Sequence, residues 1–237
     1  TKDGDRFILN GTKTWITNGS MADFAVVAAY TDKSKKGEGI SLFIVEKGFP
    51  GFTVSGKVHK LGHKAADTSE LVFENCEVPE ENLLGGEGGF QRAMATLIGA
   101  RITHAAKSVG MAQAAFEYAL QYSKERDAFG QPISKFQAIS FKLSDMAVKI
   151  ETARLMVYKA AWLYSQDKRC VKEASMAKLY AAEVVQWVAI EAVQVLGGYG
   201  YGVEYPVERY YRDAKLASLT EGTSEIQRIV IARELGL

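Results

Sequence analysis

VPEENLLGGEGG, residues Val78–Gly89, divides the chain into two parts of different composition. Before this segment, short runs of β-branched and aromatic residues alternate with turn residues. After it, Ala, Leu, Met, Lys, Gln and Glu dominate. Because Pro and clustered Gly interrupt regular structure, the segment marks a boundary. The sequence predicts a multi-domain α+β protein with a β domain at residues 1–84 and a helical domain at residues 85–237.

The part upstream of the boundary predicts a β-barrel or sandwich. Asn10-Gly11 lies between two strand-like runs, and Asn-Gly is the strongest short hairpin signal. We therefore expect a β-hairpin at this dipeptide. A polar turn is expected over residues 31–39. The candidate strands cover residues 7–9, 12–16, 24–30, 40–45, 52–58 and 70–77.

The part downstream of the boundary predicts an all-α four-helix bundle. In the second helix, Leu155, Tyr158, Ala161 and Trp162 share one face, which we interpret as core. The breaks between helices are Gly130-Gln131-Pro132, residues 166–169 and the glycine cluster after Leu196. The predicted helices cover residues 89–126, 134–165, 171–196 and 224–235.

A carboxylate lies immediately before the last predicted helix, on a loop that contains a glycine. Ser224 and Gln227 have the spacing of a capping box, which places Glu221 just outside the helix. Such a carboxylate is a candidate catalytic base, since it can reach a substrate from the loop. The alternative from the residues alone is that Glu221 only complements the helix dipole.

Composition excludes several classes of function. The 29 basic and 28 acidic residues give no net charge that would indicate a nucleic-acid partner. Cys76 and Cys170 are isolated, which argues against a disulfide framework and favours a reducing compartment. No uninterrupted apolar run approaches the ~20 residues of a membrane span, so we expect no membrane insertion. His59 and His63 have no third ligand nearby, so we expect no metal site.

Two glycine clusters resemble nucleotide-binding motifs but lack their context. The cluster at residues 85–89 has no Gly-Lys-Ser/Thr ending, and the one at residues 198–202 follows a predicted helix instead of a strand. The sequence therefore predicts neither a P-loop nor a Rossmann unit.

Five ordered motifs make the chain resemble the acyl-CoA dehydrogenase family over nearly all of its length. They are Trp15-Ile16-Thr17-Asn18-Gly19, Asp67-Thr68-Ser69-Glu70-Leu71-Val72-Phe73, Glu125-Arg126-Asp127-Ala128-Phe129-Gly130, Val195-Leu196-Gly197-Gly198-Tyr199-Gly200 and Glu221-Gly222-Thr223-Ser224-Glu225-Ile226-Gln227-Arg228. The resemblance implies the family's middle β domain followed by its C-terminal helical domain. The chain lacks an initiating Met and enters a strand almost at once, so we expect an amino-terminal helical domain and further β strands to precede it.

The resemblance implies an FAD site shared between subunits. Trp15 would pack near the flavin, Thr17 would offer a hydroxyl to the ring edge, and Arg126 would reach the pyrophosphate of a neighbouring subunit's FAD. By pattern alone, Trp15 fits a core or rim aromatic and Arg126 a cation at a helix end. The full expected cofactor set is Trp15, Ile16, Thr17, Arg126, Phe129, Gln137, Gln194, Gly197, Gly198, Thr223 and Glu225.

The resemblance also implies a reaction. Glu221 would remove the α-proton of an acyl-CoA thioester while the β-hydrogen leaves as hydride to the flavin, giving a trans-2-enoyl-CoA. Arg101 and Gly222 would contact the substrate, although Arg101 alone fits a helix-surface cation equally well. An electron-transfer flavoprotein would reoxidise the FAD. Alternatives are an acyl-CoA oxidase and a noncatalytic helical scaffold.

The resemblance finally implies the setting in which the protein works. We expect a homodimer or homotetramer, because the cofactor site would need residues of two subunits. We expect the protein in the bacterial cytoplasm or the mitochondrial matrix, which agrees with the isolated cysteines.

Overall fold

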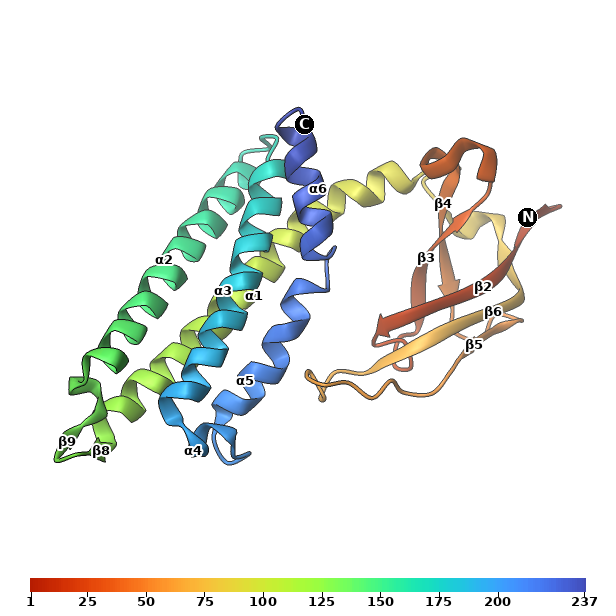
Figure 1. Cartoon of the computed structure of the whole chain (residues 1–237). Helices are drawn as coiled ribbons and strands as arrows, with labels where there is room; N and C mark the ends of the chain where they lie inside the picture. The colour runs from red at the N-terminus through yellow and green to blue at the C-terminus, as the bar shows by residue number, and fades with distance from the viewer. The chain divides into compact units, whose positions relative to one another are not determined.

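The structure is a computed structural model that describes the whole backbone and every side chain other than those of residues 90–93 and 95. Contacts between residues divide the chain into two compact units, Thr1–Ala95 and Thr96–Leu237. The first unit is built from strands and the second from helices (Figure 1). The sequence-based expectation of a β part followed by a helical part is therefore confirmed.

The first unit holds two antiparallel sheets that share one core. One sheet has the strand order β1-β2-β6-β5 and the other the order β3-β4-β7. Phe7 from the first sheet and Phe43 from the second pack edge to face, with ring centroids 5.0 Å apart. The strands are β1 Lys2–Asp3, β2 Arg6–Thr17, β3 Phe24–Tyr30, β4 Ile40–Glu46, β5 Phe52–Val54, β6 Thr68–Pro79 and β7 Leu83–Leu84.

The hairpin expected at Asn10-Gly11 is wrong, because β2 continues through this dipeptide. Both halves of β2 pair with β6, and the pairing register shifts between Leu9 and Gly11. The side chain of Asn10 bonds to Asn75 on β6: Oδ1 accepts from the Asn75 backbone N–H at 2.8 Å. A long partner strand thus turns the Asn-Gly signal into a β-bulge. The chain reverses instead between β1 and β2, where Gly4 has φ 61°.

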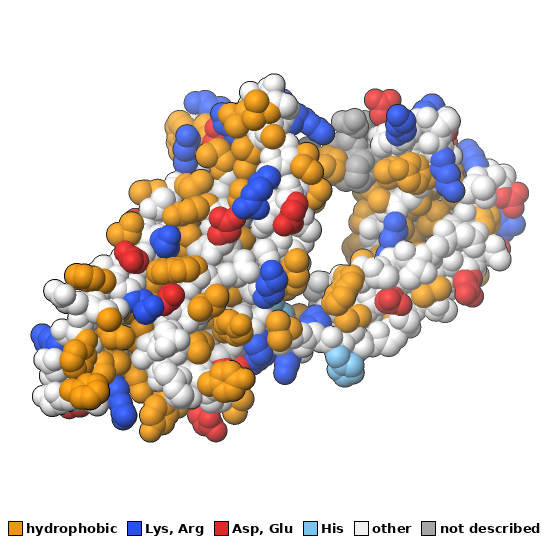
Figure 2. Space-filling view, in the orientation of Figure 1, with side chains coloured by type: hydrophobic (Ala, Val, Ile, Leu, Met, Phe, Trp, Pro, Cys, Tyr) orange, Lys and Arg blue, Asp and Glu red, His pale blue; other side chains and the backbone are white. Residues whose placement is uncertain are grey.

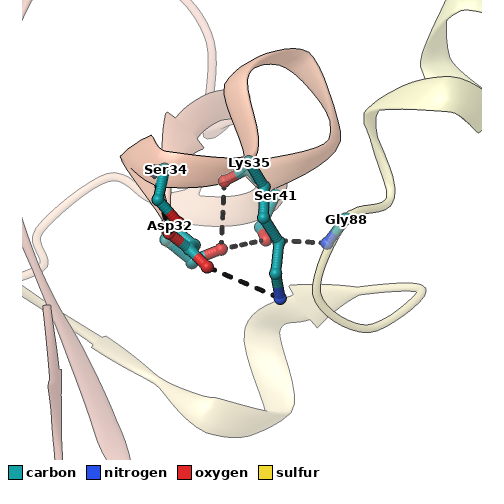
Figure 3. Close-up of polar contacts among 7 residues, drawn as sticks. Asp32, Ser34, Lys35, Ser41 and Gly88 are labelled. Atoms are coloured by element: carbon teal, nitrogen blue, oxygen red, sulfur yellow. Dashed lines mark hydrogen bonds and ion pairs between the residues drawn. The ribbon is translucent and has the colours of Figure 1, made fainter.

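The polar turn expected at residues 31–39 forms a short 3₁₀ segment, η1, at Lys33–Gly39. Asp32 caps it by accepting hydrogen bonds from the backbone N–H and the hydroxyl of Ser34, and Ser41 Oγ accepts from the backbone N–H of Gly88 at 3.1 Å (Figure 3). The Gly39 carbonyl accepts from the backbone N–H groups of residues 31 and 32, which closes the turn.

Gly39→Ala is expected to destabilise the β unit, because a Cβ at this position would lie 1.7 Å from the carbonyl oxygen of Asp32. Relieving such a clash with backbone typically costs about 1–3 kcal/mol. Urea unfolding measures the loss. Gly37→Ala is the matched control, since a Cβ there meets nothing within 4 Å. Equal stability of the two variants would contradict the expected clash.

The second unit is a bundle in which α3 is central. Helix α3 contacts α2, α5 and α6, and its buried face is rich in Ala and Val. The small side chains let neighbouring helices approach closely, so the core consists largely of alanines. The helices are α1 Phe90–Glu125, α2 Gln137–Ser165, α3 Val171–Leu196, α4 Gly198–Tyr201, α5 Pro206–Ala214 and α6 Ser224–Glu234.

All four predicted helices are present, and the sequence analysis missed α4 and α5. Helix α5 begins with Pro206 at its first turn and carries a Glu208–Arg212 ion pair at i,i+4 spacing. Both are helix signals that the preceding glycine cluster obscured. Among the described residues, α3 alone has the length and hydropathy of a membrane span, and half of that apolar window is buried inside the unit. The apolar composition of α3 therefore agrees with its place in the core of the helical unit.

The interpretation of Leu155, Tyr158 and Trp162 as core is wrong. These side chains are 59%, 61% and 55% exposed, on the outer face of α2. Figure 2 shows apolar side chains gathered on the visible face of the helical unit. Tyr and Trp carry polar groups that favour a wet surface, so an aromatic stripe does not by itself mark a core. The buried face of α2 consists of Leu143, Met146, Ile150, Ala153, Val157 and Ala160.

Candidate functional site

The loop that carries Glu221 connects a 3₁₀ turn, η4 (Lys215–Ser218), to α6. Glu221 has φ 54°, a left-handed conformation that costs a non-glycine residue of order 1–3 kcal/mol. Gly222 follows with φ 83°, and a Cβ there would lie 2.8 Å from Gln227 Nε2. The backbone is therefore held in an unfavourable shape that presents the Glu221 side chain to solvent.

The expected capping box at Ser224 and Gln227 is wrong. Thr223 is the N-cap, and its hydroxyl accepts a hydrogen bond from the Ile226 backbone N–H at 3.3 Å. Gln227 is fully buried, and its Nε2 donates to the carbonyls of Glu221 and Gly222, each at 3.0 Å. A Gln at this spacing can either cap the helix or hydrogen-bond to the preceding loop. Because Gln227 is buried, its side chain bonds to the loop.

Lys178 on α3 is a member of this site that the sequence analysis missed. Its side chain is fully buried, and Nζ donates a hydrogen bond to the Gly222 carbonyl at 2.6 Å. Burial lowers the pKa of Lys178 from 10.5 to about 8, against the opposing effect of the Glu221 carboxylate. The sequence did contain a signal for Lys178. It is a charged residue on a helix face that otherwise carries small apolar side chains, including Ala174, Ala177 and Ala181.

Arg101 lies on α1 and is 6% exposed, so its interpretation as a surface cation is wrong. Its Nη1 donates to Ser175 Oγ at 3.4 Å, and its Nε has no hydrogen-bond partner among the described residues. Burial lowers the pKa of the Arg101 guanidinium, while the charge of Glu221 acts in the opposite direction. Two buried cations, Arg101 and Lys178, therefore act on the same carboxylate.

Thr220 anchors the other end of the loop. Its hydroxyl donates to the Leu216 carbonyl at 3.2 Å and lies 2.7 Å from His104 Nε2 on α1. The Thr220 hydroxyl and His104 Nε2 therefore share a hydrogen bond whose direction depends on the tautomer of the imidazole. The loop is thus tied to α1, α3 and α6 on both sides of Glu221.

A second cluster of predicted residues lines a cleft of about 500 Å³ at the far end of α3. Arg126 follows α1, and its guanidinium lies over the ring of Tyr199, 5.7 Å from the centroid. Gly197 and Gly198 have open space where a side chain would begin. The arrangement offers a cation, an aromatic ring and accessible backbone, which suits a phosphate-bearing ligand.

Further predicted cofactor residues lie exposed around the helical unit. Phe129 is 96% exposed at the tip of the short ribbon formed by β8 Asp127–Ala128 and β9 Gln131–Pro132. Gln137 opens α2 and Gln194 lies in the last turn of α3, both exposed. Glu225 lies in the first turn of α6, where a hydrogen bond from its own backbone N–H, followed by one from Thr223, lowers its carboxyl pKa.

The predicted residues at Trp15, Ile16 and Thr17 lie in the β unit. The register between β2 and β6 shifts between Lys13 and Ile16, and Trp15 within this bulge has φ 60°. The bulge leaves Trp15 66% exposed, which excludes the interpretation as a core aromatic. Ile16 and Thr17 border a cleft of about 370 Å³ between the sheets.

The β sandwich and the helical bundle both match those of known oxidoreductases. The profile of the acyl-CoA dehydrogenase middle domain matches residues 1–76, and that of the acyl-CoA dehydrogenase C-terminal domain matches residues 87–236. The chain belongs to the acyl-CoA dehydrogenase family.

Individual relatives cover the chain almost completely. An acyl-CoA dehydrogenase of Bacillus subtilis (strain 168) is 52% identical over 99% of this chain and 62% of its own length. The mitochondrial short-chain specific acyl-CoA dehydrogenase of Mus musculus is 49% identical over 99% of this chain and 57% of its own length. The chain therefore spans about three fifths of the relatives that it matches. The relatives include bacterial and mitochondrial proteins.

Solved structures give the same result. Butyryl-CoA dehydrogenase from Megasphaera elsdenii superimposes with a TM-score of 0.96 at 50% identity, over 100% of this chain and 62% of that one. A chain in a structure described as the electron transferring flavoprotein of Acidaminococcus fermentans has a TM-score of 0.96 at 52% identity, over 99% of this chain and 62% of that one.

Proposed function

We propose that the protein containing this chain is an FAD-dependent dehydrogenase of short-chain acyl-CoA thioesters. The observation that carries the proposal is the Glu221 loop, which presents an exposed carboxylate on a strained backbone beside two buried cations. Relatives named short-chain specific acyl-CoA dehydrogenase and butyryl-CoA dehydrogenase support the substrate class.

In this proposal, Glu221 accepts the α-proton of the acyl thioester. The carboxylate needs only to swing from the loop, whose backbone is held by Gln227 and Lys178. The thioester carbonyl would lie against the backbone of Gly222, where N–H groups stabilise the negative charge that develops on its oxygen. The positive charges of Arg101 and Lys178 would also stabilise this negative charge by electrostatic attraction. The product is a trans-2-enoyl-CoA.

FAD, when bound, supplies the acceptor for the β-hydride. The residues of both units fit such a group: Thr17 borders the cleft of the β unit, and Arg126 with Gly197 and Gly198 forms a basic, open cleft in the helical unit. In the complete proposal, FAD is held by Trp15, Ile16, Thr17, Arg126, Phe129, Gln137, Gln194, Gly197, Gly198, Thr223 and Glu225.

Visible spectroscopy of the purified protein tests the proposed function. We expect a flavin spectrum that is bleached by butyryl-CoA without oxygen and restored by an electron-transfer flavoprotein. The relative whose structure carries the name of such a flavoprotein supports this acceptor. Rapid restoration by oxygen alone would identify an acyl-CoA oxidase instead. A colourless protein that cannot be reconstituted with FAD would contradict the proposal and indicate a noncatalytic scaffold.

We also propose that the protein forms a homodimer or homotetramer with FAD shared between subunits. The exposed apolar stripe on α2, which includes Leu155, Tyr158 and Trp162, is a surface that association would cover. The cleft at Arg126 is placed at the far end of the bundle from the Glu221 loop along α3, so it suits the cofactor of a second copy.

Arg126→Ala is expected to raise the dissociation constant for FAD, because it removes charge-assisted phosphate contacts worth about 1.5–3 kcal/mol each. Equilibrium dialysis of FAD measures the change, and sedimentation velocity reports the oligomeric state of the same samples. Lys124→Ala, on the same helix end, is the matched control. A monomer that binds FAD tightly, or an unchanged affinity in the Arg126 variant, would contradict the shared site.

A further inference from the structure

Two backbone carbonyls of the Glu221 loop point into the protein. Gln227 Nε2 holds the carbonyl of Glu221, and Gln227 Nε2 together with Lys178 Nζ holds the carbonyl of Gly222. The Lys178 contact, at 2.6 Å, is shorter than both Gln227 contacts, at 3.0 Å. The charged donor on α3 therefore makes the strongest connection between the loop and the helical core.

The direction of these carbonyls determines the direction of the neighbouring N–H groups. No peptide bond in the described part of the chain is cis, and in a trans peptide the C=O and the following N–H point in opposite directions. The N–H groups of Gly222 and Thr223 are thus turned away from Gln227 and Lys178. Within the described part of the chain, neither N–H has a hydrogen-bond partner. Two free donors and the exposed carboxylate of Glu221 therefore belong to one short loop.

Burying the charged side chain of Lys178 costs free energy that a purely structural contact does not require. A fully buried ammonium loses its hydration, and Arg101, a second buried cation, repels it. An apolar side chain among the alanines of α3 would avoid both costs. Gln227 already provides one donor to the Gly222 carbonyl, so Lys178 is not required merely to satisfy that oxygen.

We propose that Lys178 is a positioning residue for the reaction of Glu221. By drawing the Gly222 carbonyl inward, Lys178 keeps the Thr223 N–H of the same peptide turned outward and fixes the backbone from which Glu221 takes the α-proton. The Gly222 N–H belongs to the peptide of the Glu221 carbonyl, which Gln227 holds. This inference rests on the proposed function. Lys178 touches neither substrate nor cofactor in it and acts through the backbone of Gly222.

The test is Lys178→Met in the FAD-bound protein, with Lys172→Met on the same helix as the matched control. Steady-state kinetics with butyryl-CoA should show kcat lowered roughly 10- to 100-fold, as misplaced reacting groups typically cause, with KM within about twofold. Hydrogen exchange followed by mass spectrometry should show faster exchange over residues 219–224 in the Met variant alone. The exchange experiment reports loop order without depending on turnover.

The outcomes separate this inference from the proposed function. If the wild-type protein does not reduce its flavin with any acyl-CoA, the proposed function fails, and with it this role of Lys178. If the wild type is active and the folded Lys178→Met protein keeps both kcat and the exchange pattern, only the positioning role is overturned. Should the Met variant not fold, Lys178→Gln, which is shorter and uncharged, is measured in the same way. Wild-type kcat and exchange in that variant would equally overturn the role.

Discussion

We expect Glu221→Gln nearly to abolish flavin reduction by butyryl-CoA while FAD remains bound. The amide has almost the same shape as the carboxylate but cannot accept the α-proton, and a positioned base contributes on the order of 100- to 10,000-fold. The loop is held through backbone carbonyls, so the substitution leaves its hydrogen bonds to Gln227 and Lys178 in place. Stopped-flow bleaching of the flavin measures the rate.

Glu225→Gln is the matched control for this experiment. Glu225 is also exposed and lies four residues away in the first turn of α6, so the substitution makes the same chemical change nearby. We expect it to leave the rate of bleaching within a few-fold of wild type, with any larger effect appearing in FAD affinity. Near-wild-type reduction by the Glu221 variant would reject Glu221 as the base.

We expect the free energy of unfolding of the helical unit to rise with pH through a window set by Lys178. The pKa of Lys178 is lowered by burial to about 8 in the folded protein, from 10.5 when exposed. Between these values the unfolded chain binds more protons, so raising the pH stabilises the folded state, and the benefit is lost as the pH falls through about 8. The full change is on the order of 3 kcal/mol, from 1.36 kcal/mol per pKa unit.

Urea unfolding followed by circular dichroism across this pH window measures the effect. Lys178→Met removes the titrating group, so the wild type should gain stability relative to this variant as the pH rises. Lys172→Met, whose side chain is partly exposed at the start of α3, should follow the wild-type curve. Parallel curves for the wild type and Lys178→Met would contradict the lowered pKa.

The order of elements was predictable because it depends on local patterns. Pro79 and the glycines after Leu84 interrupt regular structure wherever they occur, and the apolar spacing of the four long helices needs no partner to be visible. The motif around Glu221 likewise placed a carboxylate on a loop before a helix, and the structure confirms that place.

Predictions failed where a distant segment decides what a local pattern does. Asn10-Gly11 forms a bulge because β6, some 65 residues away, pairs with both sides of it. Trp162 is exposed because the core-facing side of α2 is fixed by α3. An aromatic stripe can lie in a core or on an exposed surface, and an Asn-Gly dipeptide can form a hairpin turn or a β-bulge. The segment that packs against each one decides which structure forms.

The class of the fold, the family and the residue proposed as the base could be predicted from the amino-acid sequence, because each is recognised from contiguous residues. The tertiary structure alone decided what surrounds that base. Lys178, Arg101 and His104 are far from Glu221 along the chain, and they meet its loop because α1 and α3 pack beside it. Burial, which lowers the pKa of Lys178 and turns Gln227 toward the loop, is a property of packed helices and has no signature within any single segment.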